Sequence, residues 1–300
     1  MYELVIVGAG PAGMTAAVYA ARKGLVPLVL SKDLGGQANW SSEVENYMGF
    51  KDIRGSELMD RFEEQMRAQR LQHETCEVVK IERRDGGFGL RRADGKEDAA
   101  RAVIVATGKS ARALNVPGEE RLRGKGVSYC ATCDGPLFRG AAVAVVGGGN
   151  AGLQACRDLL AVAREVHLIT EGGITADRAV RDKVLGDPRL RVREHTVVRA
   201  VTGEQAVEGL IVAGPDGNET ELAVEGVFVE IGLDPNSGLL AGLARLNAER
   251  EAEVDCRCRT GVPGLFAAGD VSTSCGKQII VAAGEGAKAA LAAADYLAYG

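Results

Sequence analysis

The chain has 300 residues, a length that favours two domains of roughly 100–200 residues each. Its 36 Lys and Arg against 41 Asp and Glu give a formal net charge of −5, which argues against nucleic acid and anionic membrane surfaces as partners. Hydrophobic residues make up 46% and charged residues 26%, which excludes a wholly disordered or fibrous chain. Glycine is in excess: it accounts for 40 of the 300 residues, whereas an average share of about 7% would be roughly 21.

The ends and the cysteines of the chain indicate a cytoplasmic protein. No apolar run approaches the roughly 20 residues needed to cross a bilayer. The segment Met1–Leu4 leads directly into a strand-like run and lacks the basic region of a secretion signal. The seven cysteines are odd in number and widely spread, which does not fit a disulfide framework.

Strands and helices alternate along the first third of the chain. Apolar runs and turn signals predict strands at 4–7, 26–30, 77–84, 88–92 and 102–106, and helices from 11 to about 23 and at 56–70. A long polar segment at 31–55 separates two of these elements, and loops of that length in compact domains are usually functional.

The same order then recurs. Strands are predicted at 142–146, 166–169 and 227–231, helices at 150–163 and 175–185, and a three-stranded meander at 190–201, 208–213 and 220–224. The last helix is predicted at 279–299. Two copies of one nucleotide-binding unit therefore account for the length and for much of the glycine excess.

Each copy contains a G-x-G-x-x-G motif between a strand and a helix, at Gly8–Gly13 and at Gly147–Gly152. In this context the first glycine makes the turn, the second lets phosphate approach the backbone, and the third lets the helix pack on the strand. The helix N-terminus faces the negative charge. Two dinucleotide sites in one chain suggest a flavin in one and a nicotinamide in the other.

The residue about 20 positions after each motif reads the ribose. In the second copy it is Glu171, whose carboxylate can accept hydrogen bonds from a free 2′-hydroxyl and would repel a 2′-phosphate. This favours NADH over NADPH, although Arg178 and Arg181 lie further along and could reach a phosphate. In the first copy the equivalent residue is Ser31.

A C-x-x-C pair, Cys130 and Cys133, precedes the second copy. Two sulfurs at this spacing can form a reversible disulfide. One such pair cannot complete a four-ligand zinc site, so no metal is expected. Asp134 follows the second sulfur and could protonate a leaving thiolate if its carboxyl group is partly desolvated. Near the end, Gly269-Asp270 closes an apolar strand, where a carboxylate can bind ribityl hydroxyls.

These features resemble the low-molecular-weight thioredoxin reductases and the flavoprotein subunit of alkyl hydroperoxide reductase, over essentially the whole chain. The motifs that carry the resemblance are Gly8–Gly13, Gly35-Gly36-Gln37, Glu43-Val44-Glu45-Asn46-Tyr47, Ala106-Thr107-Gly108, Tyr129–Gly135, the second glycine motif and Gly269-Asp270.

The resemblance implies an α/β fold of two Rossmann-like three-layer (ββα) nucleotide-binding domains, one inserted in the other. An FAD-binding domain would comprise residues 1–110 and 236–300. An NAD(P)-binding domain carrying the C-x-x-C pair would comprise 111–235. The resemblance also implies a homodimer.

The family's functional residues carry over onto matching positions. The FAD contacts implied are Gly8, Gly10, Pro11, Ala12, Gly13, Ser31, Lys32, Gly35, Gly36, Gln37, Asn46, Val79, Ala106, Thr107, Gly108, Gly269, Asp270, Gln278 and Ile279. The nicotinamide contacts implied are Gly147, Gly149, Asn150, Ala151, Gly152, Glu171, Ile231 and Gly232. Cys133 would face the flavin, Cys130 would attack the partner disulfide, and Asp134 would be the acid–base residue.

The expected function is FAD-dependent thioredoxin-disulfide reduction with NADH as the donor, NADPH being second. NADPH-using members carry Ala at the end of the second glycine motif and a His-Arg-Arg run after the next strand, whereas this chain has Gly152 and Thr170-Glu171-Gly172. The alternatives are a reductase that takes electrons from ferredoxin or another flavin, and a dithiol oxidase.

The hydroperoxide reductase flavoprotein carries an additional thioredoxin-like domain at its N-terminus. Here the first glycine motif begins at Gly8, which leaves no room before it for such a domain. A separate thioredoxin or glutaredoxin-like protein is therefore the expected electron acceptor.

Overall fold

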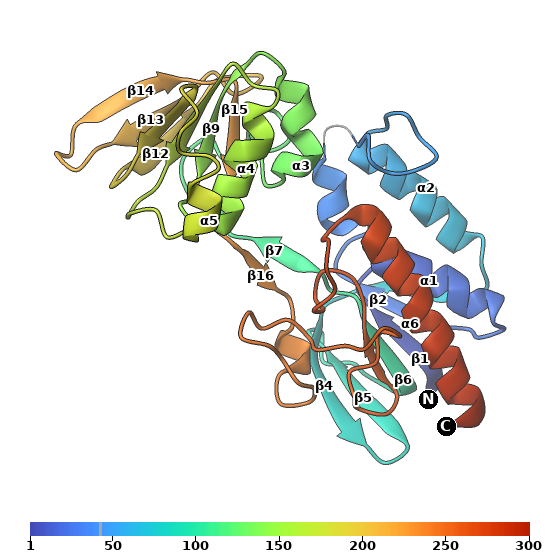
Figure 1. The fold of residues 1–300 in the computed structure, drawn as a ribbon. Helices are drawn as coiled ribbons and strands as arrows, with labels where there is room; N and C mark the ends of the chain where they lie inside the picture. Colours follow the sequence, from blue (N-terminus) through green and yellow to red (C-terminus); the bar gives the residue numbers. More distant parts are fainter. Residues whose placement is uncertain (42–43) are drawn as a thin grey trace. The chain divides into compact units, whose positions relative to one another are not determined.

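The computed structural model describes residues 1–41 and 44–300, and it divides into two compact units (Figure 1). Unit 1 comprises Met1–Asn39, Tyr47–Ser110 and Asp234–Gly300. Unit 2 comprises Trp40–Asn46 and Ala111–Leu233. Glu43, part of one motif behind the resemblance, lies outside the described residues.

Unit 1 is built on a sheet in which β1 (Tyr2–Val7) lies between β2 (Leu28–Ser31) and β6 (Glu97–Val105), all parallel. β3 (Gln72–Thr75) extends the sheet beyond β2, and β17 (Leu265–Ala267) pairs with β6. The start of β6 also pairs with an antiparallel hairpin formed by β4 (Val78–Arg84) and β5 (Gly87–Arg92). The long strand β6 therefore joins the parallel part to the hairpin.

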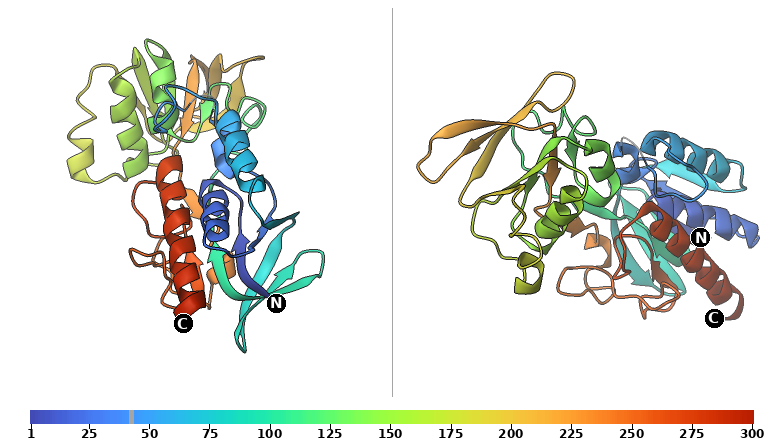
Figure 2. Two further views of the ribbon diagram at one scale, coloured as in Figure 1. Left: turned by 90° about the vertical axis from the view of Figure 1, so that its right-hand side faces the viewer. Right: turned by 45° about the horizontal axis from the view of Figure 1, so that its top comes forward.

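Side-chain alternation along the strands places unit 1 in three layers. One face of the parallel strands packs against the hairpin, with Val5 and Val105 contacting residues such as Phe88 and Leu90. Three helices belong to the same unit: α1 (Pro11–Arg22), α2 (Gly55–Arg67) and α6 (Ile279–Tyr299). α1 and α6 lie side by side (Figures 1 and 2), and a Cβ on Gly286 would come within 1.9 Å of the Ala12 carbonyl oxygen.

Unit 2 repeats this plan. Its parallel sheet has the order β11 (Leu190–Arg193), β10 (Glu165–Ile169), β9 (Ala142–Val146), β15 (Gly226–Val229) and β8 (Val127–Ser128). An antiparallel sheet of β12 (Val197–Thr202), β13 (Gly209–Ala213) and β14 (Glu219–Ala223) packs on one face. α3 (Ala131–Asp134) and α4 (Asn150–Leu160) belong to the other face, together with the short helix α5 (Arg178–Arg181).

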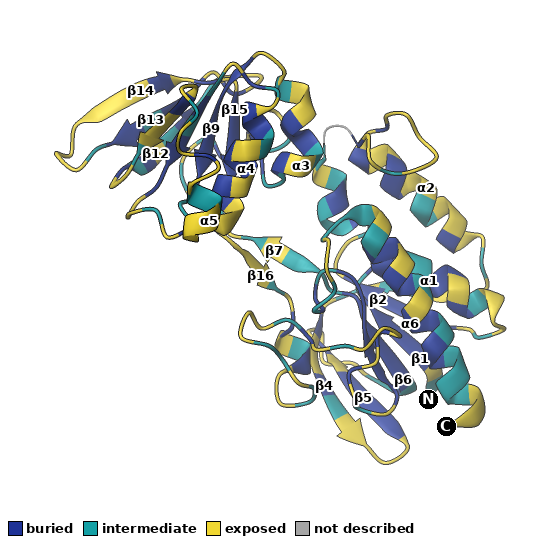
Figure 3. Ribbon diagram, in the orientation of Figure 1, coloured by how far each residue is buried: buried dark blue, intermediate teal, exposed yellow. Residues whose placement is uncertain are grey.

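Burial follows these layers in both units. In Figure 3 the inner strands of the parallel sheets are buried, whereas the outer faces of the helices are exposed. Phe228 packs with α4 residues such as Leu153 and Leu159, and its neighbours Val227 and Val229 pack with the antiparallel sheet. Each parallel sheet is thus covered on both sides, as Rossmann-like sheets are.

The long segment of unit 2 is connected to unit 1 through β7 (Lys109–Ala111) and β16 (Leu233–Pro235), which pair with each other. Beside them the backbone N–H of Arg112 donates to the carbonyl oxygen of Gly232 at 3.0 Å. The two ends of the segment 112–232 are therefore neighbours.

Two local predictions are wrong. The helix expected at 175–185 is only Arg178–Arg181, because Asp177 is held by Asn150 and the loop before it is bonded to Gly148. The strand expected at 190–201 is two strands, since His195 has φ of 51° and breaks the run. β11 joins the parallel sheet, and only β12 belongs to the meander.

Candidate active site

The first glycine-rich turn follows β1, at the point where the strand order of unit 1 reverses. A Cβ on Gly8 would come within 2.4 Å of the Ala106 carbonyl oxygen, and one on Gly13 within 1.8 Å of the Gly8 oxygen. Packing alone therefore requires glycine at both positions. At Gly10 the nearest atom to a Cβ is the Gly35 carbonyl oxygen, 3.9 Å away. This open space at the start of α1 fits a phosphate that approaches the backbone.

The segment after β2 is bonded onto that turn. The buried hydroxyl group of Ser31 accepts the Ala9 N–H at 3.0 Å and donates to the carbonyl oxygen of Asp33. Gly35 donates its N–H to the Ala9 carbonyl oxygen at 2.8 Å. Lys32 forms an ion pair with Glu77 at 2.7 Å. The structure therefore brings Ser31 and Gly35 to the glycine-rich turn.

Of the other residues expected to contact the flavin, some are bonded to neighbouring segments of unit 1 and others are not. Gly36 donates its N–H to the Asp33 carboxylate at 3.1 Å, and the Gln37 amide donates to the Lys109 carbonyl oxygen. Thr107 and Gly108 follow β6 and bond to Asn236, which lies just after β16. Val79 is 45% exposed on β4, and no contact that the structure describes joins it to the turn. Asn46 is grouped with unit 2.

Asp270 lies three residues after β17 and is partly buried. Burial raises its pKa, while the positive charges of Lys277 and Lys109 oppose the rise. Gly269, at φ of 75°, donates its N–H at 2.8 Å to the buried carboxylate of Glu285 on α6. Glu285 is a residue that the sequence prediction missed, and it fixes the turn that presents Asp270.

The N-terminus of α6 lies close to a charge cluster that the prediction also missed. Gln278 caps this helix and Ile279 is its first residue. Glu251 forms ion pairs with Lys109 at 2.6 Å and with Lys277 at 3.3 Å. The Lys109 and Glu251 side chains are only 10% and 14% exposed. Burial alone would raise the pKa of Glu251, but hydrogen bonds from Lys109 and Asn247 and the charge of Lys277 together lower it, so the cluster stays charged.

The second glycine-rich turn, after β9, repeats the geometry of the first. A Cβ on Gly147 would come within 2.2 Å of the Glu230 carbonyl oxygen, and one on Gly152 within 1.9 Å of the Gly147 oxygen. At Gly149 the nearest atom, the Thr175 hydroxyl oxygen, is 4.0 Å away. Both copies therefore need their first and third glycines for packing and leave space at the second.

The loop after β10 closes over this turn. Thr175 and Ala176 donate their N–H groups to the Gly148 carbonyl oxygen, and Asn150 exchanges two hydrogen bonds with Asp177. Glu171 is exposed at the end of β10, and its carboxylate has no partner among residues 1–41 and 44–300. Ala151 follows Asn150 on α4, and Ile231 and Gly232 follow β15 at the same carboxyl edge of the sheet.

The redox pair lies on α3, which begins directly after Cys130. Cys130 and Cys133 form a disulfide, and the Cys133 N–H donates to the Cys130 sulfur at 3.2 Å. The other cysteines differ: burial raises the pKa of Cys156 and of Cys258 to about 12, which keeps these thiols protonated. Cys256 and Cys275 are exposed.

The last residue of α3 is Asp134, whose side chain is buried. Burial raises its pKa, and a hydrogen bond from the Ser128 hydroxyl group to Oδ2, at 2.6 Å, opposes that rise. The other oxygen, Oδ1, is buried without a hydrogen-bond partner in the described structure. A carboxyl group in this state can hold a proton and give it to a nearby thiolate.

A second carboxyl group near the disulfide, which is partly buried, was missed by the sequence prediction. Glu230 follows β15, and its side chain accepts the N–H of Ala131, which lies between the two cysteines. Burial raises its pKa to about 7. The apolar run Val227–Val229 ends directly in this glutamate, but the sequence contains no signal that places it beside α3.

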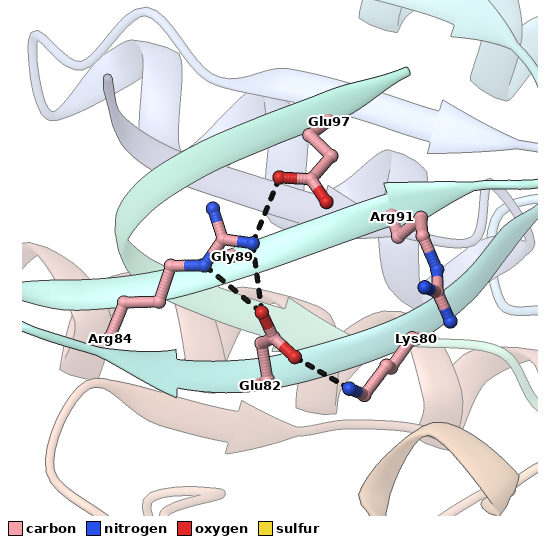
Figure 4. Close-up of a pocket in the computed structure, with 6 residues that line it drawn as sticks. All are labelled: Lys80, Glu82, Arg84, Gly89, Arg91 and Glu97. Atoms are coloured by element: carbon pink, nitrogen blue, oxygen red, sulfur yellow. Dashed lines mark hydrogen bonds and ion pairs between the residues drawn. The ribbon is translucent and has the colours of Figure 1, made fainter. Parts of the chain in front are cut away.

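On the β4–β5 hairpin and the adjoining strand β6, charged side chains form ion pairs with one another. A small pocket on the β4–β5 hairpin is lined by Lys80, Glu82, Arg84, Gly89, Arg91 and Glu97. Figure 4 shows that Glu82 bridges Lys80 and Arg84, and that Arg84 also reaches Glu97. Among the described residues, no group of three His, Cys, Asp or Glu could hold a metal ion, and no helix is long and apolar enough to cross a membrane.

Comparison with known proteins identifies close relatives of this architecture. The chain is 40% identical to the alkyl hydroperoxide reductase F subunit of Pseudomonas putida, over 99% of the chain and 58% of that protein. It is 38% identical to the NADH dehydrogenase of Bacillus subtilis, with similar coverage. The chain thus spans less than three fifths of the length of these curated relatives.

The solved structures match over their full length. Thioredoxin reductase from Streptococcus pyogenes has a TM-score of 0.94 at 34% identity, and 99% and 98% of the two chains are covered. Thioredoxin reductase from Giardia duodenalis has a TM-score of 0.92 at 29% identity, with the same coverage. These similarities confirm the resemblance and the fold of two Rossmann-like domains that the motifs predict.

The family model "Pyridine nucleotide-disulphide oxidoreductase" matches residues 2–286 and therefore includes both glycine-rich turns, the disulfide and Asp270. On this evidence the chain belongs to the pyridine nucleotide-disulphide oxidoreductase family.

Proposed function

We propose that the chain is an FAD-dependent thioredoxin-disulfide reductase that takes electrons from NADH. The observation that carries this proposal is the Cys130–Cys133 disulfide, which lies in the unit with the second glycine-rich turn and is followed by a buried carboxyl group. A disulfide with an adjacent proton donor suits reversible thiol–disulfide exchange rather than a structural link.

Unit 1 is proposed to hold FAD, in a domain of residues 1–110 and 236–300. The space at Gly10 fits the pyrophosphate, Asp270 would bind ribityl hydroxyls, and the N-terminus of α6 would lie toward the pyrimidine edge of the flavin. When bound, the flavin supplies two-electron transfer between a nicotinamide and a disulfide. The residues of the chain bind and orient it.

Unit 2 is proposed to bind NADH, in a domain of residues 111–235. The space at Gly149 supports a bound pyrophosphate, and the unpaired carboxylate of Glu171 would accept hydrogen bonds from both ribose hydroxyls. Arg178 is paired with Asp182 at 3.5 Å, which lowers its attraction for a 2′-phosphate. The relative named NADH dehydrogenase supports the same donor.

Cys130 is proposed as the thiol that attacks the partner disulfide, Cys133 as the sulfur that meets the flavin, and Asp134 as the acid–base residue. A thioredoxin or glutaredoxin-like protein is the proposed acceptor. The relatives named as alkyl hydroperoxide reductase F subunits make a peroxiredoxin the second acceptor to test. A homodimer in the cytoplasm is proposed from the same resemblance.

Anaerobic titration of the purified flavoprotein tests the donor. We expect NADH to bleach the flavin absorbance at a concentration at least about tenfold below NADPH, because a carboxylate at the ribose favours the free hydroxyl. Glu171→Ala should weaken the binding of NADH but not that of NADPH. Substitution of an exposed glutamate elsewhere, Glu208→Ala, should change the binding of neither. Equal response to both nucleotides would contradict the assignment.

Thiol variants test the exchange reaction. Cys130→Ser should reduce thioredoxin turnover to background while NADH still bleaches the flavin, because only the nucleophile is lost. Cys256→Ser, which changes an exposed cysteine outside the pair, is the matched control and should retain full turnover. Full turnover in Cys130→Ser would overturn the proposed thiol roles.

Two alternative reactions are distinguished by the same sample. Flavin bleaching by reduced ferredoxin, with no response to either nicotinamide, would select a ferredoxin-linked reductase; the open space at Gly149 favours the nicotinamide instead. Oxygen uptake with a small dithiol would select a dithiol oxidase.

A further inference from the structure

Ser128 lies two residues before Cys130. Its hydroxyl group connects the backbone of Cys130 to the carboxyl group of Asp134. It is the last residue of β8, 5% exposed, and it pairs in register with Phe228 of the neighbouring strand β15. Its position is therefore fixed by the sheet and not by the loop that carries the cysteines.

The hydroxyl oxygen of Ser128 accepts the backbone N–H of Cys130 at 3.1 Å. The single hydroxyl hydrogen has two acceptors in reach: Asp134 Oδ2 at 2.6 Å and the Cys130 carbonyl oxygen at 3.4 Å. The shorter distance assigns this hydrogen to Asp134. One hydroxyl group thus joins the backbone of the first cysteine to the carboxyl group after the second.

This assignment decides which oxygen of Asp134 exchanges a proton. Oδ2 already accepts the Ser128 hydrogen, so the proton of the neutral acid belongs on Oδ1. Oδ1 is buried and has no hydrogen-bond partner among the described residues, as expected of an oxygen that exchanges its proton with a thiolate. A backbone bond from the Asp134 N–H to the Cys130 carbonyl oxygen, 3.1 Å, holds the rest of the turn.

We propose that Ser128 is a positioning residue for thiol–disulfide exchange, whose hydroxyl group orients Asp134 so that Oδ1 delivers and recovers the proton. This inference rests on the proposed function. In the exchange the Cys130 thiolate attacks one sulfur of the partner disulfide, and the Asp134 proton passes to the partner thiolate that leaves. Cys133 then attacks Cys130, which restores the internal disulfide and releases the partner's second thiolate; the proton lost by the Cys133 thiol returns to Asp134.

A merely structural role is the competing explanation, since Ser128 also bonds to the Cys130 backbone. Ser128→Thr and Ser128→Val form a matched pair with equal added volume that differ only in the hydroxyl group. The Thr variant should keep turnover with thioredoxin within about twofold. The Val variant should lose about tenfold in kcat with little change in KM, and flavin bleaching by NADH should remain normal in both.

The pH profile separates the two explanations. The Ser128 hydrogen bond favours the charged form of Asp134, so its loss in Ser128→Val should move the basic limb of kcat upward by about one pH unit. In an Asp134→Asn background the same substitution should add no further loss. A Val variant with the wild-type profile, or a multiplicative loss in the double variant, would overturn the positioning role.

The test also separates this inference from the function on which it rests. If Asp134→Asn keeps full turnover, the acid role in the proposed function is wrong, whatever Ser128 does. If Asp134→Asn loses turnover but Ser128→Val does not, only the role of Ser128 is wrong. If the Thr and Val variants both lose flavin content, Ser128→Ala and Ser128→Gly replace them, because they add no volume. Both remove the hydroxyl group and should therefore move the basic limb of kcat upward in the same way.

Discussion

At the scale of single residues, unit 2 contains two carboxyl groups whose surroundings favour the neutral form. Asp134 is the last residue of α3 and accepts a hydrogen bond from Ser128, and Glu230 accepts the N–H of Ala131 on the same helix. Desolvation is the main cause of the raised pKa in both. The pKa of Glu230 is raised to about 7, so this group makes stability depend on pH in the physiological range.

Glu230→Gln tests that dependence. The pKa of Glu230 rises from 4.5 to about 7 on folding, so its protonated form stabilises the fold fully below pH 4.5. This contribution is lost as pH rises through 7, and amounts at most to about 3 kcal/mol. We expect the free energy of unfolding of the variant, relative to wild type, to increase between pH 5 and pH 8.

Urea unfolding at several pH values measures this difference, and the exposed Glu208→Gln serves as the control that should show no such trend. A constant difference between variant and wild type over this range would show that Glu230 does not titrate on folding.

At the scale of elements, the two βα turns separate packing from binding within a single motif. A methyl group on the first or third glycine of either turn would lie within 2.4 Å of a backbone oxygen, whereas one on the second would enter open space. A ligand is therefore the only reason in the described structure for glycine at Gly10 and Gly149. The same spacing in sequence thus serves two physical needs.

Two alanine substitutions in the second turn separate these needs. Gly152→Ala would force a Cβ within 1.9 Å of the Gly147 oxygen and should cost more than about 3 kcal/mol of stability. Gly149→Ala should unfold like the wild-type protein but bind NADH at least about tenfold more weakly, because its methyl group occupies the phosphate position. Thermal unfolding and nucleotide titration of both variants check this; equal thermal stability would contradict it.

The elements that local signals define well were predictable, and those that depend on distant partners were not. α6 begins and ends at the predicted residues, because the alanine-rich run between Ile279 and Tyr299 contains no proline. The polar strand β3 lacks an apolar pattern and forms by pairing with β2. Ser128 and Glu230 acquire their partners only when β8 and β15 pair, so no spacing in the sequence marks them.

At the scale of the whole molecule, the two units have separate cores but unequal continuity in sequence. Nearly all of unit 2 comes from one stretch, whereas unit 1 is assembled from three. The N–H of Arg112 and the carbonyl oxygen of Gly232, 3.0 Å apart, mark where that stretch begins and ends. A short connection could therefore replace the stretch without straining unit 1.

Replacement of residues 112–232 by a few glycines tests this. The sheet from β3 to β17 remains complete, so we expect a folded protein that binds FAD and unfolds cooperatively. It should lack reduction by NADH and all thioredoxin turnover. Circular dichroism and flavin absorbance measure the result, and a chain that fails to fold would show that unit 1 depends on unit 2.

The adjacency of Arg112 and Gly232 also has a consequence for inheritance. Strands β7 and β16 pair, so the two ends of the segment 112–232 lie next to each other. Recombination between genes could therefore exchange the DNA that encodes 112–232 without disturbing the core of unit 1. Donor preference would then pass between lineages with that segment, and genealogies calculated from the two parts of the chain need not agree.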